Sequence, residues 1–375
     1  MRHVLIAATS LSLIAAPSAA VAQQAGQLIA ADPVVDTPGG MQAWRIRYWT
    51  SDGSNRPREV TGMVVAPREA IPARPRNVIA WTHGTWGISS KCAPSLSANF
   101  WKVTPALDAV ARGDVVVAPD YPGLGSTGMH PFLAGSDTAR SVIDAVRAAR
   151  QIAGAAAGGR YAVWGESQGG HAALWTAQAS RSFAPDLELV GAAAAAPPTD
   201  LIENLRQSPN KTVKTFFTAY IGRSWSSHYG APMATFGGPQ TRAIMTRLAD
   251  NNCIELHSKP KLGTIIGIMT LQGRLKNVDL GQVEPWASLA RRNSPITGRI
   301  GVPLLIAQNA KDDLVAPAVT AAHVRALCRS GNRVRRIAIK GDGHATSARD
   351  SARETLEWIA DRFAGRPAPS DCGRI

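Results

Sequence analysis

The sequence is poor in charged residues and lacks long apolar runs, and both shortages narrow the kinds of protein that it can encode. Charged residues make up 18% of the 375 positions, against 45% hydrophobic ones. This is enough apolar material for a sizeable core, in one large domain with an insertion or in two modest domains. After the N-terminal 22 residues, no apolar run is long enough to cross a bilayer, so no transmembrane helix is expected.

Basic residues are in excess but are not clustered. The formal net charge is +14, and most of the positive charge comes from arginine. A nucleic-acid-binding surface usually shows a long basic run or basic residues interleaved with aromatic ones, and this chain has neither. The sequence therefore predicts no nucleic-acid partner.

Cysteine is scarce, and its spacing excludes a zinc site. There are four cysteines, none of them in a Cys-x-x-Cys or Cys/His pattern, so we expect no structural metal. An even number of cysteines in an exported protein predicts two disulfides, for which three pairings are possible. The pairing we favour joins Cys92 to Cys253 and Cys328 to Cys372, which would tie the C-terminal tail to the last layer of the fold.

The N-terminus has the pattern of a secretory signal. Arg2 and His3 precede an apolar run over 4–16 that is too short to span a bilayer, and small residues end the segment at Ala22. The pattern predicts a signal peptide over 1–22, cleavage after Ala22, and a secreted or periplasmic protein.

Apolar strands alternate with helical segments along most of the chain. The expected strands are 77–82, 114–119, 160–165, 187–195, 302–307 and 333–339, and the expected helices are 105–112, 136–153, 168–181, 317–329 and 348–364. This rhythm predicts an α/β fold with a mostly parallel sheet between layers of helices. Before these alternating strands and helices, residues 23–40 are expected to form a loose N-terminal segment. The alternating segments 44–50 and 59–66 predict an antiparallel hairpin at a sheet edge.

The alternation of strands and helices is interrupted between residues 199 and 300. This segment contains helical and glycine-rich stretches but no βα repeat, so we expect a mainly helical cap over the carboxyl edge of the sheet. The expected organisation is a core in two parts, 23–198 and 301–375, separated by the cap 199–300. Two apolar stretches of the cap, 215–221 and 262–271, either line a substrate pocket or pack the cap onto the core.

Ser167 lies at the centre of a strand-to-helix turn. Gly165 and Gly169 flank it at two residues on either side, an apolar strand precedes it, and an alanine-rich helix follows. Gly-x-Ser-x-Gly in this context is the nucleophile elbow, which holds a reactive serine in strained backbone angles above the sheet. Ser167 is therefore the candidate nucleophile.

A serine nucleophile needs a base, and the base needs an acid to orient it. In the elbow fold these partners follow the serine in the order acid, then histidine. A carboxylate turn after the strand at 302–307 contains Asp312, with Asp313 as the alternative acid, and a glycine-rich loop after the last strand contains His344. The remaining histidines are expected to serve packing or lie on the surface: His83, His130, His171, His228, His257 and His323.

Two backbone N–H groups are expected to form an oxyanion hole. One belongs to Gln168, directly after the nucleophile, and the other to Thr85, in the loop after the strand at 77–82. Glu166 is an unusual neighbour for the nucleophile, and either a structural hydrogen bond or a contact with substrate would explain it. We favour the structural role.

Together these motifs resemble the secretory lipase family of α/β-hydrolases. The matching segments are 83–87, 92–95, 119–125, the elbow, the Asp312 turn and His344, in the same order along most of the chain. The resemblance implies an ester-hydrolysing Ser–Asp–His triad, a cap inserted before the acid, and two disulfides. Glu166 departs from the family, which often carries tyrosine or a small residue there, and this leaves the substrate preference open.

The sequence as a whole predicts a secreted serine hydrolase of carboxylic esters that needs no cofactor or metal. Its partner would be a small-molecule or lipid ester, with at most transient contact with lipid interfaces. Three alternatives remain: an acyltransferase, a peptidase with the same triad, and a relative that only binds. Acyl chain length and oligomeric state are not predicted.

Overall fold

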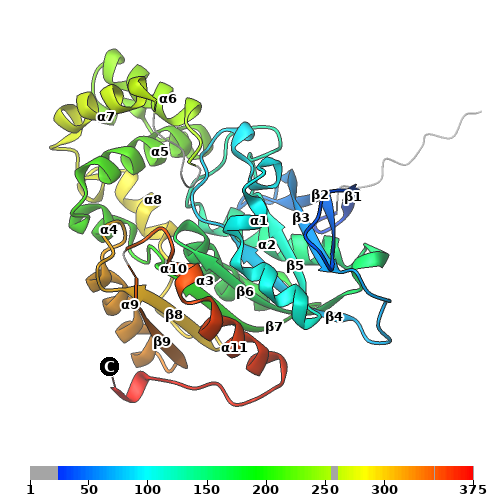
Figure 1. Ribbon diagram of the computed structural model, residues 1–375. Coiled ribbons are helices and arrows are strands. Elements are labelled where there is room, and N and C mark those ends of the chain that lie inside the picture. The colour runs from blue at the N-terminus through cyan, green and yellow to red at the C-terminus, as the bar shows by residue number, and fades with distance from the viewer. Residues whose placement is uncertain (1–23, 255–260, 342, 375) are drawn as a thin grey trace, which may run out of the picture.

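A nine-stranded sheet runs through the part of the chain that the computed structural model describes, residues 24–254, 261–341 and 343–374 (Figure 1). The strand order is β1-β2-β3-β5-β4-β6-β7-β8-β9. The strands are β1 Leu28–Val34, β2 Met41–Ser51, β3 Pro57–Pro67, β4 Arg76–Thr82, β5 Val115–Pro119, β6 Ala157–Glu166, β7 Glu188–Ala195, β8 Leu304–Asn309 and β9 Val334–Ile339. The predicted signal peptide and His257 lie outside the described residues.

The sheet is parallel from β5 through β4 to β9 and antiparallel at its N-terminal end. The central strands are buried on both faces, so successive side chains enter different cores. On β5, Val115 and Val117 pack into one core, whereas Val116 packs into the other. Such near-continuous apolar strands are typical of a parallel sheet covered on both sides. The predicted fold class is confirmed.

The prediction of a loose segment over 23–40 is wrong in part. Residues 28–34 form β1, which pairs with β2, so the sheet edge lies one strand beyond the predicted hairpin of β2 and β3. The side chains of β1 are half-buried or exposed. An edge strand is ordered by backbone hydrogen bonds to one neighbour and needs no apolar alternation, which is why the sequence carries little sign of it.

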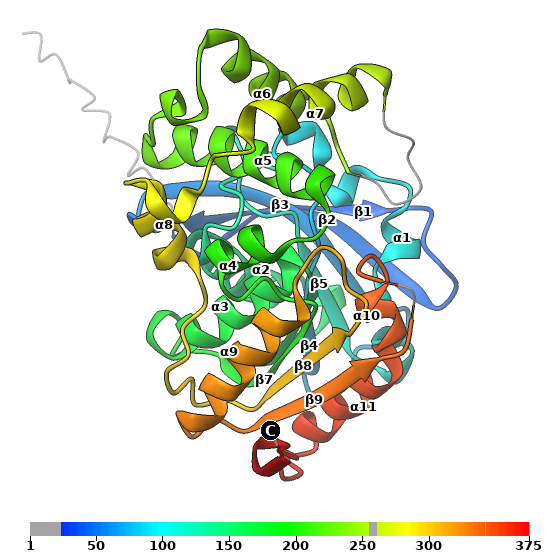
Figure 2. The same cartoon turned by 90° about the vertical axis from the view of Figure 1, so that its left-hand side faces the viewer.

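Helices cover both faces of the sheet (Figure 2). One core joins the sheet to α2 Gly135–Ala149, α3 Gln168–Phe183 and α9 Pro317–Arg329. The other joins it to the 3₁₀ helix Pro105–Arg112 and α11 Ala352–Phe363, next to the short helices α1 Phe100–Val103 and α10 Ser347–Asp350. In the described ranges, no helix has both the length and the apolarity needed to cross a bilayer.

Between β7 and β8 the chain forms a group of helices with its own hydrophobic cluster. They are α4 Leu201–Gln207, α5 Lys211–Tyr229, α6 Pro239–Asn251, α7 Leu262–Leu275 and α8 Trp286–Asn293. Figure 1 shows α5, α6 and α7 stacked above the sheet. Trp225, Phe236 and Trp286 are fully buried at the centre of this cluster. Both apolar stretches singled out in the sequence lie here, on α5 and α7.

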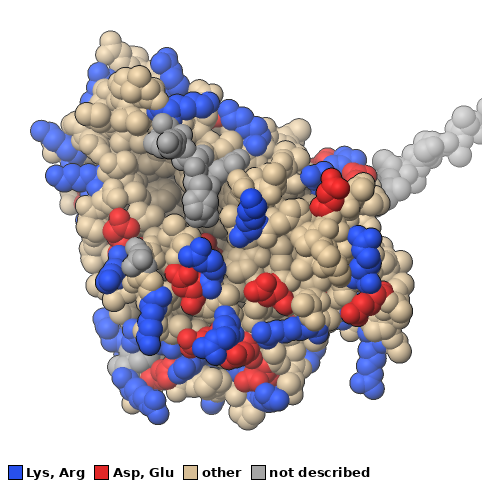
Figure 3. All heavy atoms as spheres, viewed as in Figure 1, with Lys and Arg blue, Asp and Glu red and all other residues tan. Residues whose placement is uncertain are grey.

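Charged side chains are spread unevenly over the face that Figure 3 shows. Lysine and arginine alternate with aspartate and glutamate over the lower part of this face, where α9, β9 and α11 lie. Over the upper part, where α6 and α7 lie, the charged side chains are mainly basic.

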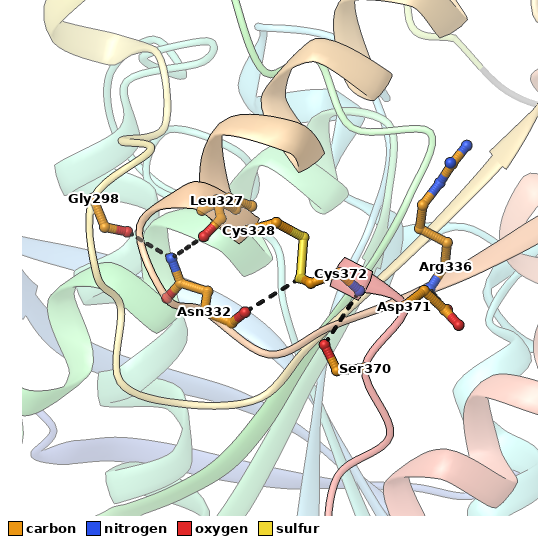
Figure 4. Close-up of a disulfide and its surroundings, with 8 residues drawn as sticks. All are labelled: Gly298, Leu327, Cys328, Asn332, Arg336, Ser370, Asp371 and Cys372. Atoms are coloured by element: carbon orange, nitrogen blue, oxygen red, sulfur yellow. Dashed lines mark hydrogen bonds between the residues drawn. A yellow bond between two sulfur atoms is a disulfide. The ribbon is translucent and has the colours of Figure 1, made fainter. Parts of the chain in front are cut away.

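Both favoured disulfides are present, joining Cys92 to Cys253 and Cys328 to Cys372. The second fixes the C-terminal tail against α9 and β9 (Figure 4). Beside it, the Asp371 N–H donates to the Val334 carbonyl at 2.8 Å, and the Arg336 N–H donates to the Asp371 carboxylate at 2.7 Å. The tail is therefore held by a covalent bond and by hydrogen bonds to the edge of β9.

Replacing both Cys328 and Cys372 by alanine should lower the free energy of unfolding by up to about 4 kcal/mol, because the disulfide closes a long loop in the unfolded chain. Urea unfolding followed by circular dichroism measures the change. Ser370→Ala, which alters the same turn and leaves the disulfide intact, is the control. Equal stability of the double variant and this control would contradict the prediction.

Candidate active site

Ser167 occupies a strained position between β6 and α3. Its backbone has φ 55° and ψ −120°, outside the regions that non-glycine residues favour. The flanking glycines are required sterically: a Cβ on Gly165 would lie 1.9 Å from Thr82 Oγ1, and one on Gly169 would lie 1.8 Å from the Thr82 carbonyl oxygen. Tight packing against β4 therefore makes the turn possible and leaves the Ser167 side chain half-buried.

Asp312 and His344 form a hydrogen-bonded pair in the turns that follow β8 and β9. His344 Nδ1 lies 2.8 Å from Asp312 Oδ2, and both side chains are buried. The Leu314 and Val315 N–H groups donate to Asp312 Oδ1 at 2.9 Å each, and Gln308 Nε2 donates to Oδ2.

This arrangement fixes the charge of Asp312 and the tautomer of His344. Burial alone would raise the pKa of Asp312, but the hydrogen bond and charge of His344 and the two backbone N–H groups lower it below its ordinary value. An ionised carboxylate only accepts hydrogen bonds, so His344 Nδ1 carries a proton and Nε2 is left to take one up.

The neighbouring acid, Asp313, points elsewhere. Its side chain is exposed, and its Oδ2 accepts a hydrogen bond from Asn210 Nδ2 at 3.3 Å, at the start of α5. Adjacent residues in a turn direct their side chains to different sides, and here Asp312 is the one that faces the histidine.

Ser167 and His344 line the same cavity of about 880 Å³, between the sheet and the helices above it. Its other lining residues are mostly apolar and include Trp81, Phe100, Val103, Phe216, Phe217, Ile254, Ile268 and Leu314. A second cavity of about 50 Å³ also borders Ser167 and contains Thr85 and Gln168 in its walls. The structure thus brings together all five residues predicted from the sequence for catalysis and the oxyanion hole.

The apolar stretches 215–221 and 262–271 serve both purposes that the sequence left open. Phe216, Phe217 and Ile268 line the large cavity. Tyr220 and Leu271, by contrast, are buried in the cluster between the helices. Within each stretch, some residues therefore line the cavity and others pack between the helices.

The backbone around Ser167 offers hydrogen-bond donors to a bound group. Gln168 is the first residue of α3, and the first N–H groups of a helix have no acceptor within it. Thr85 belongs to the loop after β4 and borders the same small cavity. Negative charge next to these N–H groups would also be stabilised by the N-terminal end of the helix dipole.

Two buried histidines hold this region in place, a role that the sequence did not reveal. Gln168 Nε2 donates to His130 Nε2 at 2.6 Å, and His130 Nδ1 donates to the Pro122 carbonyl at 3.0 Å. Burial lowers the pKa of His130 to about 3 and that of His83 to about 4, so both rings are neutral. His83 stacks on Tyr121 with ring centroids 4.1 Å apart, which supports the loop that carries Thr85.

The other described histidines lie on helices α3, α5 and α9. His171 and His323 are buried on helices, and His228 contacts Asp137 at 3.1 Å between α5 and α2. Among the described residues, no three His, Cys, Asp or Glu side chains are grouped so that they could hold a metal ion.

Glu166 connects the elbow to the loop of His344. Its Oε1 accepts a hydrogen bond from the Ala348 N–H at 2.8 Å, and its side chain also lines the large cavity. Burial raises the pKa of Glu166 to about 7, although the Ala348 N–H and His344 oppose this shift. The hydrogen-bonding role favoured from the sequence is present, together with a position on the cavity wall.

A family model described as secretory lipase matches residues 96–222. Among curated relatives, a protein named probable inactive lipase from Mycobacterium tuberculosis is 25% identical over 353 residues, covering 88% of this chain and 75% of the relative. Lipase 5 of Candida albicans is 24% identical over 361 residues, covering 89% of this chain and 74% of the relative.

Solved structures of lipases and esterases share the fold. Candida antarctica lipase A in its closed state superposes with a TM-score of 0.75 at 20% identity, over 92% of this chain and 86% of that one. LipA of Xanthomonas oryzae, described as a rice cell wall degrading esterase, superposes with a TM-score of 0.69 at 18% identity. The match covers 91% of this chain and 98% of that one.

Replacing Glu166 by glutamine should make the free energy of unfolding less sensitive to pH between about 4.5 and 7. The pKa of Glu166 is about 7 in the folded chain and 4.5 in the unfolded one, so its ionisation opposes folding. As pH rises from about 4.5 to 7, the wild type should lose up to about 3 kcal/mol of stability that the variant retains. The amide of the introduced glutamine keeps an oxygen that can accept the Ala348 N–H.

Urea unfolding at pH 5 and at pH 8 measures this difference, and Glu188→Gln, at an exposed site, is the matched control. If the difference in the free energy of unfolding between wild type and Glu166→Gln is the same at both pH values, Glu166 does not titrate between them.

Proposed function

On the premise that this chain is a member of the secretory lipase family with the α/β-hydrolase fold, we propose that it is an exported serine hydrolase of carboxylic esters. The observation that carries the proposal is the arrangement of three side chains. Ser167, at the strained elbow, and His344, hydrogen-bonded to Asp312, line one apolar cavity.

The reaction would begin with attack of Ser167 Oγ on the ester carbonyl carbon. His344 Nε2 takes the serine proton, and the charge of Asp312 stabilises the imidazolium that forms. The carbonyl oxygen becomes an oxyanion, and the N–H groups of Thr85 and Gln168 are the donors for it. When the C–O bond to the alcohol breaks, His344 gives its proton to the leaving oxygen, and the acyl group remains on Ser167.

Water would then complete the cycle by the same steps. His344 removes a proton from the water molecule as its oxygen attacks the acyl carbon, and the acid leaves when the proton returns to Ser167 Oγ. This chain's own residues supply every proton transfer. The apolar walls of the cavity, with Phe216 and Ile268, favour an ester with an apolar acyl or alcohol part.

Export and the cap complete the proposal. The pattern over 1–22 is that of a cleavable signal, and the two disulfides fit an oxidising compartment. The segment 199–300 is proposed as a cap domain that selects the substrate, because its helices supply much of the cavity wall while the sheet supplies the reacting groups.

A second function, binding without catalysis, is favoured by one observation: the mycobacterial relative is named a probable inactive lipase. This chain has a serine, an acid and a histidine at the positions needed for chemistry. Labelling of Ser167 by a fluorophosphonate, which reacts with activated serines, would distinguish an active site from an inert one. Acyl transfer would be detected from the products formed when an alcohol acceptor is added, and a peptidase by cleavage of peptide substrates.

Ser167→Ala should lower kcat on p-nitrophenyl esters by about 10⁶, since it removes the nucleophile, and should abolish fluorophosphonate labelling. Ser182→Ala changes an exposed serine on the same helix and is the control. An alanine variant within tenfold of the wild type would remove the basis of the proposed mechanism.

Asp312→Asn should lower kcat by about 10⁴, because an amide in place of the carboxylate allows the wrong tautomer of His344. Asp313→Asn, one residue further along the same turn, should stay within a few-fold of the wild type. Steady-state kinetics on a soluble ester compares the two variants. A larger loss from Asp313→Asn would assign the acid to the neighbouring residue.

A further inference from the structure

Two cavities border the proposed nucleophile. The large one, of about 880 Å³, and the small one, of about 50 Å³, both include Ser167 in their walls. Thr85, Phe217 and Leu314 also line both cavities, so these side chains lie where the two spaces adjoin. An ester bound at Ser167 has an acyl part and an alcohol part, one on each side of the reacting bond. The two cavities therefore offer separate places for the two parts.

Helix α5 presents different side chains to the two cavities. Val213 and Phe216 line the large cavity, Ile221 lines the small one, and Phe217 lies in both walls. Residues three or four apart lie on the same side of a helix, so 213 with 216 and 217 with 221 form two neighbouring rows. Substitutions at Phe216 and at Ile221 therefore alter different cavities.

The position of His344 determines which part of the ester enters which cavity. In the described part of the chain, His344 lines the large cavity only. In the proposed mechanism its ring gives a proton to the alcohol oxygen as the C–O bond breaks, so that oxygen must lie within hydrogen-bond reach of Nε2. The alcohol part consequently extends into the large cavity. The acyl part continues on the other side of the carbonyl carbon, into the small cavity beside Gln168.

The small cavity limits the length of the acyl part. A space must exceed about 10–15 Å³ to hold one water-sized group, so about 50 Å³ has room for about three or four methyl or methylene groups. Its wall is apolar over Leu133, Leu201, Ile221 and Val315, which offers such groups apolar contacts. The large cavity, by contrast, has room for a bulky alcohol.

The walls of the small cavity are held by stacking and by hydrogen bonds. The rings of Phe132 and Phe217 are stacked with centroids 5.9 Å apart, and the Phe132 carbonyl accepts a hydrogen bond from Trp225 Nε1 at 2.7 Å. In addition, the Leu314 N–H donates to the Asp312 carboxylate at 2.9 Å. Longer acyl groups would have to displace these side chains, and overfilling a packed space is costly.

We propose that the small cavity is an acyl pocket for groups of about two to five carbons, and that the large cavity receives a bulky apolar alcohol. Phe217 and Ile221 are then the side chains that set the limit of acyl length. The inference rests on the proposed function and deepens it by naming the substrate class, which is short-chain carboxylic esters of large apolar alcohols.

A pair of isomeric esters tests the assignment of the two cavities. Naphthylmethyl acetate has a short acyl group and a bulky alcohol, whereas methyl naphthylacetate has the same atoms with the bulky group on the acyl side. Both release an alkyl alcohol, so their intrinsic reactivities are similar. We expect kcat/KM, measured by chromatography of the products, to be at least about tenfold higher for naphthylmethyl acetate. Equal values, or a preference for methyl naphthylacetate, would overturn the proposal.

Two substitutions test the limit of acyl length. The measured quantity is the ratio of kcat/KM for p-nitrophenyl octanoate to that for p-nitrophenyl butyrate, which we expect to be below about 0.1 in the wild type. Ile221→Ala and Leu205→Ala remove side-chain volume from the wall of the small cavity and should raise this ratio at least about tenfold. Both substrates meet the same preparation, so partial loss of folded protein leaves the ratio unchanged.

Phe216→Ala is the matched control, because Phe216 directly precedes Phe217 on α5 and lines the large cavity. It should weaken the preference for a bulky alcohol and leave the octanoate-to-butyrate ratio within a few-fold of the wild type. A wild type that prefers octanoate, an unchanged ratio in Ile221→Ala and Leu205→Ala, or an equal shift in Phe216→Ala would each contradict the inference. Failure of the proposed hydrolase itself gives a different result, which is no fluorophosphonate labelling of Ser167 and no turnover of any ester.

Discussion

The contact between the elbow and Thr82 is the constraint on which the rest of the site depends. Thr82 Oγ1 donates to the carbonyl of Gly169 at 2.8 Å and lies 3.1 Å from that of Trp164. With glycine at 165 and 169, β4 and the start of α3 approach so closely that Ser167 must take its strained angles. Because Thr82 is the last residue of β4, the same contact also sets where the loop with Thr85 begins. The proposed nucleophile and the loop of the proposed oxyanion donor are thus positioned by one packing contact.

A buried polar network extends this constraint into the neighbouring loops. Asp120 accepts hydrogen bonds from the Ser95 N–H and hydroxyl and from Thr61, and burial raises its pKa to about 6 despite them. Tyr121 donates to the carbonyl of His83 at 3.0 Å. Buried groups that are fully hydrogen-bonded make the loops that carry them rigid. Rigid loops suit the proposed oxyanion hole, because a donor is effective only if it is in position before the charge develops.

The sequence reveals those parts of the site whose local pattern is tied to their geometry. The glycines around Ser167, the apolar strands before Asp312 and His344, and the order of these residues follow from the needs of the elbow fold. Spacing favours Asp312 but leaves Asp313 open as an alternative, since the two differ by one position. Side-chain direction separates them, because Asp312 contacts His344 and Asp313 contacts Asn210. The pair of Gln168 and His130 was missed because its partners lie on separate segments. Strand β1 was missed because an edge strand needs backbone pairing rather than a marked pattern.

Helix α7 illustrates how one sequence stretch can serve two surfaces. Its apolar residues are too many for one face, so a buried helix or a pocket wall were the natural interpretations. In the fold, one side packs on α5 and α6 and borders the cavity, and the other side remains in solvent. Gly263, Gly267 and Gly273 each weaken an isolated helix by up to about 1 kcal/mol relative to alanine, so packing of the inner side must hold α7 together. Any change that loosens this packing would therefore disturb the cavity wall and the exposed side at once.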